Sequence, residues 1–388
     1  MKITDRISRI QPSITLEMTA KAAELRAQGV DVINLSVGEP DFDTPENIKE
    51  AAYSAIKNGM TKYTAGSGIP ELKSAIIKKL KRDNNLIFEN DNIIVSCGGK
   101  HTLYNACQVL FQKGDEVIIF SPYWVSFPDF VSVTGAKPVI VPTIAENQYE
   151  PDFSILEKSI NKNTRGIIIN SPSNPTGGVW GDEAIKRTLN LAKKYNLWVF
   201  SDECYEQLTY DSDFTSIQTF DLTNDKILTF QSCSKTYAMT GWRIGYTAGH
   251  PEVIKAMGKL QSQSTSCPNS IAQHAAVEAL SGPQDAILKM KKQFKKRRDC
   301  IIEGLNEING IHTEIPGGAF YVFPCLEGLI QANKINDAWD FCFQLLEEKS
   351  IASVPGRSFG AENNIRFSYA ISSERINLAV RRIKELLS

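Results

Sequence analysis

The sequence predicts an α/β fold, in which helices cover both faces of a mostly parallel sheet and a smaller α+β domain is formed from both chain ends. Two observations predict the sheet and the second domain. Short β-branched runs alternate with helix-length amphipathic segments through the middle of the chain, and the C-terminal part then changes to a mixture of short strands and helices. With 388 residues and 42% hydrophobic content, the chain can bury a core large enough for more than one domain.

Seven apolar runs predict the strands of the large sheet. They are near-continuous in Val, Ile, Leu and Phe, as expected for strands that are covered on both faces. The runs are 92–96, 116–120, 137–141, 165–169, 197–201, 226–230 and 244–248. The pattern turns helical from about 251 to 309, where we interpret the charged run 289–300 as a solvated helix face.

The C-terminal unit is predicted from the strand-like runs 319–323, 351–354 and 365–370, a helix near 336–349 and a terminal helix. The first 45 or so residues contain no pattern for the large sheet, so we expect them to join this unit. The expected boundaries are an N-terminal arm and part of the small domain over 1–45, the large domain over 46–285 and the small domain over 286–388.

Charge and composition exclude several classes of partner. The chain has 43 basic and 44 acidic residues and no basic stripe, so we expect neither nucleic acid nor an anionic membrane surface as a partner. The start, "MKITDRISRI", lacks the apolar core of a signal peptide, and no run approaches the roughly 18 apolar residues of a membrane span, so a cytoplasmic protein is expected. Eight scattered cysteines without a C-x-x-C pair indicate neither a disulfide framework nor a metal site.

Polar residues follow the predicted strands, at the sheet edge where ligands of open α/β sheets bind. Gly98 and Gly99 open a helix after the run 92–96 and would admit an anion, although such a glycine pair is often only a turn. The segment "NSPSNPTG" presents Asn174 on a proline-stiffened loop. Asp202 and Tyr205 follow the run 197–201, where a carboxylate is either a helix cap or the partner of a buried cation.

The segment "SCSKTYAMTGWRIGY", 232–246, places one lysine among hydroxyls between two buried strands. Lys235 must be exposed, paired or chemically consumed, because an unpaired buried ammonium is costly. Ser232, Ser234 and Arg243 are phosphate ligands by chemistry, and a desolvated lysine near a second cation becomes a nucleophile. The ligand would need a phosphate for the hydroxyls and Arg243, a carbonyl for Lys235, a basic ring nitrogen for Asp202, and a phenolic oxygen for Asn174 and Tyr205. Together these groups indicate pyridoxal phosphate (PLP).

The ordered motifs resemble those of a known family along nearly the whole chain. They are "NLSVGEPDFDTP", "KYTAGSGIPELK", "CGGKHTLYNA", "SPYWVSFPD", "NSPSNPTGG", "SDECYE", "SCSKTYAMTGWRIGY" and "IRFSYA". The set is similar to that of the class I aminotransferases of PLP fold type I, and most similar to their prokaryotic-type aspartate aminotransferase branch. The lysine motif is the most specific of them.

The resemblance implies a role for each matching residue. Lys235 would hold the cofactor and move the proton at the substrate α-carbon, Asp202 would keep the ring nitrogen protonated, and Tyr205 would bind the ring oxygen. Asn174 would also bind the ring oxygen, and Trp124 would stack on the ring. Gly38 and Arg366 would bind the α-carboxylate of the substrate. The phosphate would be bound by Gly99, Lys100, Ser232, Ser234 and Arg243. Asn174 and Trp124 would also contact the substrate. Tyr63 would reach the phosphate of a neighbouring subunit, which implies a homodimer with shared sites.

The resemblance also implies the substrates. Lys100 and Thr15 would bind the distal carboxylate of aspartate, which predicts ping-pong exchange between L-aspartate and 2-oxoglutarate. Aromatic amino acids and prephenate are the alternative substrates, but Gln11 stands where prephenate-using relatives often carry lysine, and this departure argues against prephenate. A PLP lyase, a cyclopropane-forming synthase and a PLP-binding transcription regulator are further alternatives. The regulator would need a DNA-binding domain, for which the short start before "NLSVGEP" leaves no room.

Overall fold

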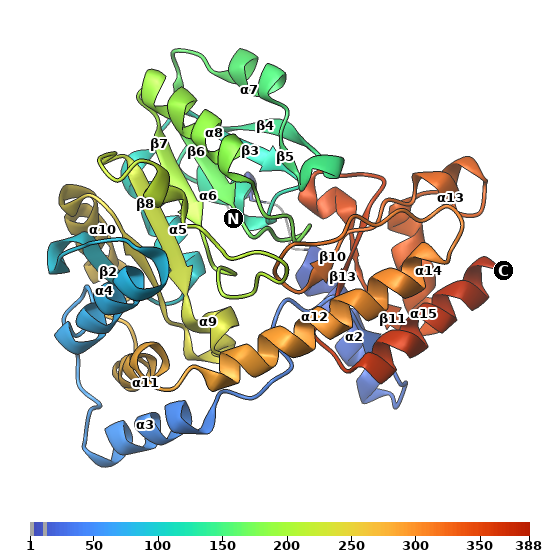
Figure 1. The fold of residues 1–388 in the computed structure, drawn as a ribbon, viewed down its shortest axis with the longest axis horizontal. Coiled ribbons are helices and arrows are strands. Elements are labelled where there is room, and N and C mark those ends of the chain that lie inside the picture. The colour runs from blue at the N-terminus through green and yellow to red at the C-terminus, as the bar shows by residue number, and fades with distance from the viewer. Residues whose placement is uncertain (1–3, 11–13) are drawn as a thin grey trace.

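The computed structural model describes residues 4–10 and 14–388 and contains one large central sheet (Figure 1). All seven expected strands are present, and β5 adds an eighth at the edge beside β4. From β8 to β4 neighbouring strands are parallel, whereas β9 is antiparallel to both β2 and β8, and β5 is antiparallel to β4. The spatial order is β2 (Ile93–Ser96), β9 (Gly245–Ala248), β8 (Ile227–Ser232), β7 (Trp198–Asp202), β6 (Thr164–Asn170), β3 (Glu116–Ser121), β4 (Lys137–Ile144) and β5 (Glu150–Pro151).

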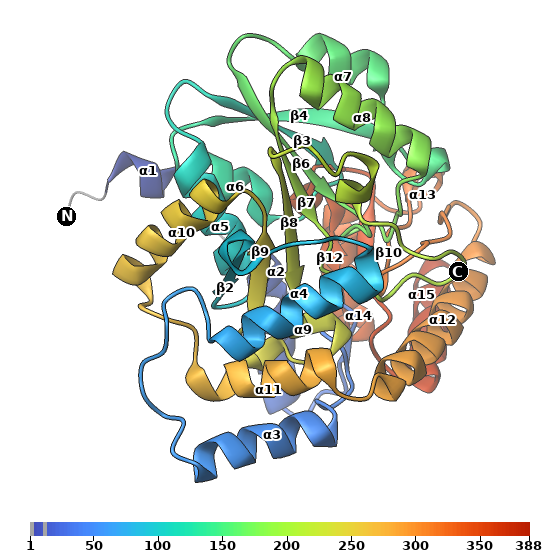
Figure 2. The same cartoon turned by 60° about the vertical axis from the view of Figure 1, so that its left-hand side comes forward.

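Helices cover both faces of this sheet. One face packs against α5 (Gly99–Leu110), α6 (Ser126–Ser132) and α10 (Pro251–Ser264), and the other against α7 (Phe153–Ser159) and α8 (Asp182–Lys194). The end of the sheet at β2 and β9 is covered by α3 (Glu46–Lys57), α4 (Pro70–Asn84) and α11 (Ser270–Ser281); Figure 2 shows α3 beside α11. Burying each large aliphatic side chain contributes about 1.5–3 kcal/mol, so these layers stabilise the sheet that positions the site.

Helix α8 illustrates how local sequence specifies an element. Ile185, Leu189 and Ala192 recur at helical spacing and are buried against the sheet. The first turn carries Asp182 and Glu183 and the last turn carries two lysines, so the charges favour both ends of the helix dipole.

The C-terminal part forms a second core. Its antiparallel sheet has the order β10 (Tyr321–Val322), β13 (Ile365–Ser368) and β12 (Val354–Pro355). A strand from the start of the chain, β1 (Ile33–Asn34), pairs in parallel with β11 (Ile351–Ala352), and Met18 and Leu35 share the core with C-terminal residues. The expected domain boundaries stay a prediction. The helices here are α2 (Ile14–Ala27), α12 (Asp285–Asn306), α13 (Glu327–Gln331), α14 (Ala338–Lys349) and α15 (Ser373–Leu387).

The remaining elements are short. They are α1 (Asp5–Ser8), α9 (Cys233–Thr236) and the 3-10 turns at Asn90–Asn92, Ala145–Asn147, Ile217–Phe220, Thr240–Trp242 and Gly356–Phe359. Within residues 4–10 and 14–388, no helix has the length and apolar character needed to cross a membrane.

The charged run 289–300 corrects one expectation, because only part of it is solvated. On α12, Met290, Phe294 and Ile301 form a buried stripe, and the two arginines of the run lie in the same stripe. Arg297 donates two hydrogen bonds to Asp41, at 2.7 and 2.9 Å, and Arg298 pairs with Asp211. Helical spacing places 297 and 298 beside the apolar positions of α12, and charge content alone does not show this.

Candidate active site

Lys235 lies on α9, directly after the central strand β8. Its ammonium nitrogen donates a hydrogen bond to the carbonyl oxygen of Gly38 and lies 6.0 Å from the centre of the Phe320 ring. Burial lowers the pKa of Lys235, and the positive charges of Arg366 and Arg243 act in the same direction. The amine is therefore more easily deprotonated than an ordinary lysine, as a nucleophile or proton acceptor must be.

Asp202 is the last residue of β7, the strand next to β8, so strand pairing brings it near Lys235. Its side chain is only 6% exposed, and burial raises its pKa to about 7. The backbone N–H of Cys204 donates to Asp202 Oδ1 at 3.2 Å, and this bond and the charge of Lys235 favour the ionised form. A cationic ligand group placed beside this carboxylate would offset much of the cost of burying its charge.

Arg366 on β13 carries a buried positive charge without an acidic partner among the described residues. Its Nη1 donates to Asn174 Oδ1 at 2.9 Å, and its Nη2 donates to the carbonyl oxygen of Ser36 at 2.6 Å. The Nε has no hydrogen-bond partner in the described part of the chain, and burial lowers the pKa of the guanidinium. Such a group has unused capacity to bind an anion, above all a carboxylate.

Tyr321 is a site residue that the sequence did not predict. Its hydroxyl lies 2.9 Å from that of Tyr205, and the Arg366 guanidinium lies 4.6 Å from the centre of its ring. The run 319–323 predicted only a strand. A tyrosine inside an apolar run needs a hydrogen-bond partner when it is buried, and this was the one available signal.

Gly98 and Gly99 form a cradle at the N-terminus of α5. Gly98 has a φ of 97°, and a Cβ there would lie 2.2 Å from an Arg243 nitrogen, so only glycine fits. Across from the cradle, Ser232 Oγ lies 2.9 Å from Ser234 Oγ. Backbone N–H groups of the helix start, two hydroxyls and a guanidinium thus face one region, a combination suited to a phosphate.

Lys100 lies beside this cradle, and its nitrogen is 5.1 Å from the centre of the Trp124 ring. Partial burial and the charge of Arg243 lower the pKa of Lys100. Tyr63 is 89% exposed in the single chain. Thr15 lies in α2, but its side chain and all of Gln11 are outside the described residues.

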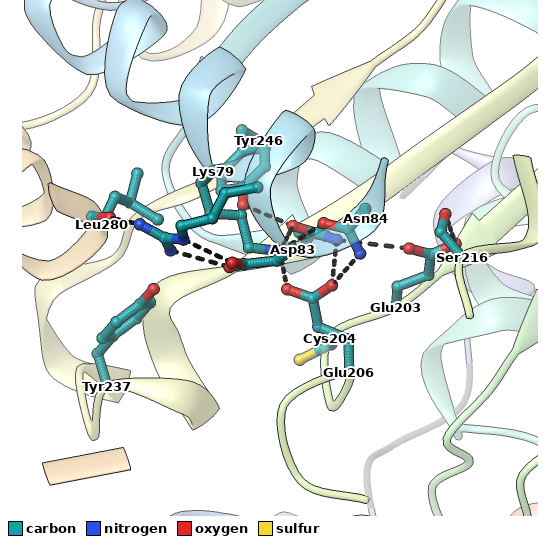
Figure 3. A network of polar contacts seen from close by, with 12 residues as sticks. Lys79, Asp83, Asn84, Glu203, Cys204, Glu206, Ser216, Tyr237, Tyr246 and Leu280 are labelled. Carbon is teal, nitrogen blue, oxygen red and sulfur yellow. Dashed lines mark hydrogen bonds and ion pairs between the residues drawn. The ribbon is translucent and has the colours of Figure 1, made fainter. Parts of the chain in front are cut away.

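A buried network of polar side chains contacts the segment 202–206 (Figure 3). Lys79 of α4, only 2% exposed, forms an ion pair with Glu206, and Asn84 donates to the same carboxylate at 2.6 Å. The side-chain amide of Gln231 accepts from Lys79 at 2.9 Å and donates to Glu206 at 2.8 Å. Burial, with Glu206 nearby, raises the pKa of Glu203 to about 7. The network ties α4 and β8 to the turn that carries Asp202 and Tyr205.

Comparison of the structure with solved structures identifies the fold class. The structure superposes on the aspartate aminotransferase of Thermus thermophilus with maleate, with a TM-score of 0.94, 40% identity and full coverage of both chains. The fold is therefore that of the PLP enzymes of fold type I.

The particular family follows from sequence. The family Aminotransferase class I and II matches residues 30–383, and the chain belongs to it. A probable aspartate/prephenate aminotransferase of Rhizobium leguminosarum bv. phaseoli is 46% identical over 391 residues, which cover 98% of each chain. An aspartate aminotransferase of Bacillus subtilis is 43% identical and covers 100% of this chain and 99% of its own.

Proposed function

We propose that this chain is a PLP-dependent aspartate aminotransferase, which exchanges an amino group between L-aspartate and 2-oxoglutarate to give oxaloacetate and L-glutamate. The observation that carries the proposal is Arg366, whose buried guanidinium lacks an acidic partner among the described residues. It donates to Asn174 and to the carbonyl oxygen of Ser36, two residues before the Gly38 carbonyl to which Lys235 donates. An amino acid substrate would pair its carboxylate with Arg366 and would thereby place its α-carbon near the amine of Lys235. The names of the full-length relatives support aspartate as the donor.

The residues present fit PLP. The phosphate would be held by Gly99, Lys100, Ser232, Ser234 and Arg243, and a Cβ at Gly98 would close the space between the cradle and Arg243. The ring nitrogen would meet the Asp202 carboxylate, the ring oxygen would be bound by Tyr205 and Asn174, and Trp124 would stack on the ring. When bound, PLP supplies an aldehyde for an amine and a ring that withdraws electrons from the substrate α-carbon.

Each protein group then has a defined task. Arg366 and Asn174 hold the α-carboxylate, which fixes the α-carbon near the amine of Lys235. Lys235, with its lowered pKa, would take the proton from the α-carbon and hold it for return. Asp202 would hold the ring nitrogen of PLP and, as a carboxylate, favour its protonated form, which supports electron withdrawal by the ring.

We also propose a homodimer in which Tyr63 completes the site of the partner subunit. The supporting observation is that a tyrosine at the end of a glycine-rich loop is almost fully exposed in the single chain. Tyr53, Ile56 and Met60 are exposed apolar residues nearby in sequence, as expected for a surface that a second subunit covers.

Steady-state kinetics with a panel of amino donors, against 2-oxoglutarate and oxaloacetate, tests the proposal. Aspartate with 2-oxoglutarate is expected to give the highest kcat/KM, and aromatic amino acids lower values. Prephenate belongs in the panel as an acceptor because relatives 44–46% identical are named aspartate/prephenate aminotransferases. A protein that binds PLP but transaminates none of these pairs would refute the proposal.

A further inference from the structure

Two buried tyrosines, Tyr205 and Tyr321, face each other next to Arg366. Their hydroxyl oxygens are 2.9 Å apart, and their rings meet edge to face at 5.8 Å. Tyr321 is fully buried and lies on β10, whereas Tyr205 follows β7, so the contact joins the C-terminal sheet to the large sheet. The hydroxyl of Tyr321 also lies close to Gly38, where a Cβ would be only 2.8 Å from it, so a larger residue at position 38 would collide with this hydroxyl.

Either tyrosine could donate the hydrogen bond between the two hydroxyls. A tyrosine has one hydroxyl proton, and the proposed function directs the proton of Tyr205 at the phenolic oxygen of PLP, so the proton between the two hydroxyl oxygens comes from Tyr321. Burial raises the pKa of both tyrosines, and the Arg366 guanidinium, which lies against the Tyr321 ring, acts in the opposite direction on both.

We propose that Tyr321 is a positioning residue that donates its hydrogen bond to Tyr205 and so keeps the proton of Tyr205 directed at the phenolic oxygen of PLP. Because Arg366 polarises Tyr321, the strength of this bond also depends on whether a substrate carboxylate neutralises Arg366. Tyr321 thus links Arg366, which binds the substrate carboxylate, to Tyr205, which binds the ring oxygen of PLP. The hydrogen bond from Arg366 to Asn174 is a second link between the same two places. This inference rests on the proposed function of the same site.

Other charged and titratable groups around the pair remain the same in a Tyr321→Phe variant. They are Lys235 on α9, Asp202 on β7, Arg366 on β13, the Cys204 thiol, and Glu39 and Arg243 farther from the pair. Phenylalanine keeps the ring beneath Arg366 and removes only the hydroxyl. A change in the absorbance midpoint of Tyr321→Phe therefore measures the loss of the Tyr321 hydroxyl as a hydrogen-bond donor.

The test is a spectroscopic pH titration of the PLP-loaded enzyme without substrate. When the donor to Tyr205 is lost, the phenolic oxygen of PLP becomes more basic, and the protonated form of the chromophore is favoured. Y321F should raise the absorbance midpoint by about 0.5–1 pH unit. It should lower kcat with aspartate by about 3- to 10-fold and change KM less than twofold, since Arg366 keeps its support.

Y369F is the matched control. Tyr369 is also fully buried in the C-terminal unit, and its hydroxyl contacts the carbonyl oxygen of Ala319 and the hydroxyl of Tyr210 rather than Tyr205. It should leave the midpoint unchanged. An unchanged midpoint in a PLP-loaded Y321F would overturn the inference, as would equal shifts in Y321F and Y369F.

A second titration separates action through Tyr205 from any other route. In the Y205F background, adding Y321F should shift the midpoint by less than about 0.2 pH unit, roughly a quarter of the single-variant effect. An undiminished shift in that background would refute the relay through Tyr205. These outcomes differ from failure of the proposed function, in which the parent enzyme itself would show no lysine-bound PLP absorbance.

Discussion

Replacing Asp202 by asparagine should make the cofactor-free enzyme more stable while removing most of its activity. The asparagine side chain would keep an oxygen for the Cys204 N–H but would carry no charge to bury. Burial moves the pKa of Asp202 from 3.8 to about 7. At 1.36 kcal/mol per unit, the buried charge destabilises the cofactor-free fold by at most about 4 kcal/mol when it is fully ionised.

The pH dependence has a definite sign. The folded-state pKa is raised, so the folded protein binds the proton more tightly than the unfolded chain, and stability falls as pH rises through the interval from about 3.8 to about 7. Below this interval the group is neutral in both states, and above it the cost is complete and constant. The stability gain of D202N over the parent should therefore grow by about 2–3 kcal/mol between roughly pH 5 and pH 8.

Urea unfolding of both cofactor-free proteins, at one protein concentration and several pH values, measures this gain. Glu203 titrates in the same range, but it is present in both proteins and cancels in the difference. In the PLP-loaded enzymes the ring nitrogen pairs with Asp202, so the gain should shrink or reverse, while turnover falls about 10²-fold or more. A stability difference that does not change with pH, or a D202N enzyme with near-normal turnover, would refute the reasoning.

Three further predictions concern the lysines and the dimer. Lys235→Ala should abolish turnover while PLP still binds through its phosphate, and borohydride reduction of the parent followed by peptide mapping should find the cofactor on Lys235 and on no other lysine. Mixing an inactive Tyr63 variant with an inactive Lys235 variant should restore up to one intact site per heterodimer; verified heterodimers without activity would exclude Tyr63 from the partner's site. Lys100→Ala should raise KM for aspartate about tenfold and change phenylalanine little, because an apolar side chain has no distal carboxylate to lose; equal losses on both substrates would assign Lys100 to the cofactor.

The sequence was sufficient for the large sheet because its signals are local. Each of the seven strands is a near-continuous apolar run, and four of the runs are followed by residues that the sequence singles out as candidate ligands. Since the carboxyl ends of parallel strands lie at one edge, the strand assignments placed Asp202 and Lys235 at the same edge of the sheet. That their strands β7 and β8 are neighbours is seen only in the structure. The two-residue strand β5 was too short to show a period.

Pairings between distant segments could not be predicted in this way. Lys79 lies among several lysines of "KSAIIKKLKRDNN", and helical spacing from Leu72 and Ile76 places it on the buried side of α4, but this spacing does not show what pairs with its charge. Only the tertiary structure places Glu206 and Gln231 beside it. Arg297 and Arg298 likewise have partners, Asp41 and Asp211, that lie far away in sequence.

The same limit explains why the sequence predicts candidate ligands of the site but not the residues that support them. A ligand residue has an unusual type at a strand end, and this can be read from a single segment. A supporting residue such as Tyr321 has an ordinary type in an ordinary strand, and its role arises only from its contacts with Tyr205 and Arg366. Removing such a group leaves the ligands in place and changes the energies of their protonation states. Its effect should therefore be seen first in a titration midpoint, and only afterwards in a rate.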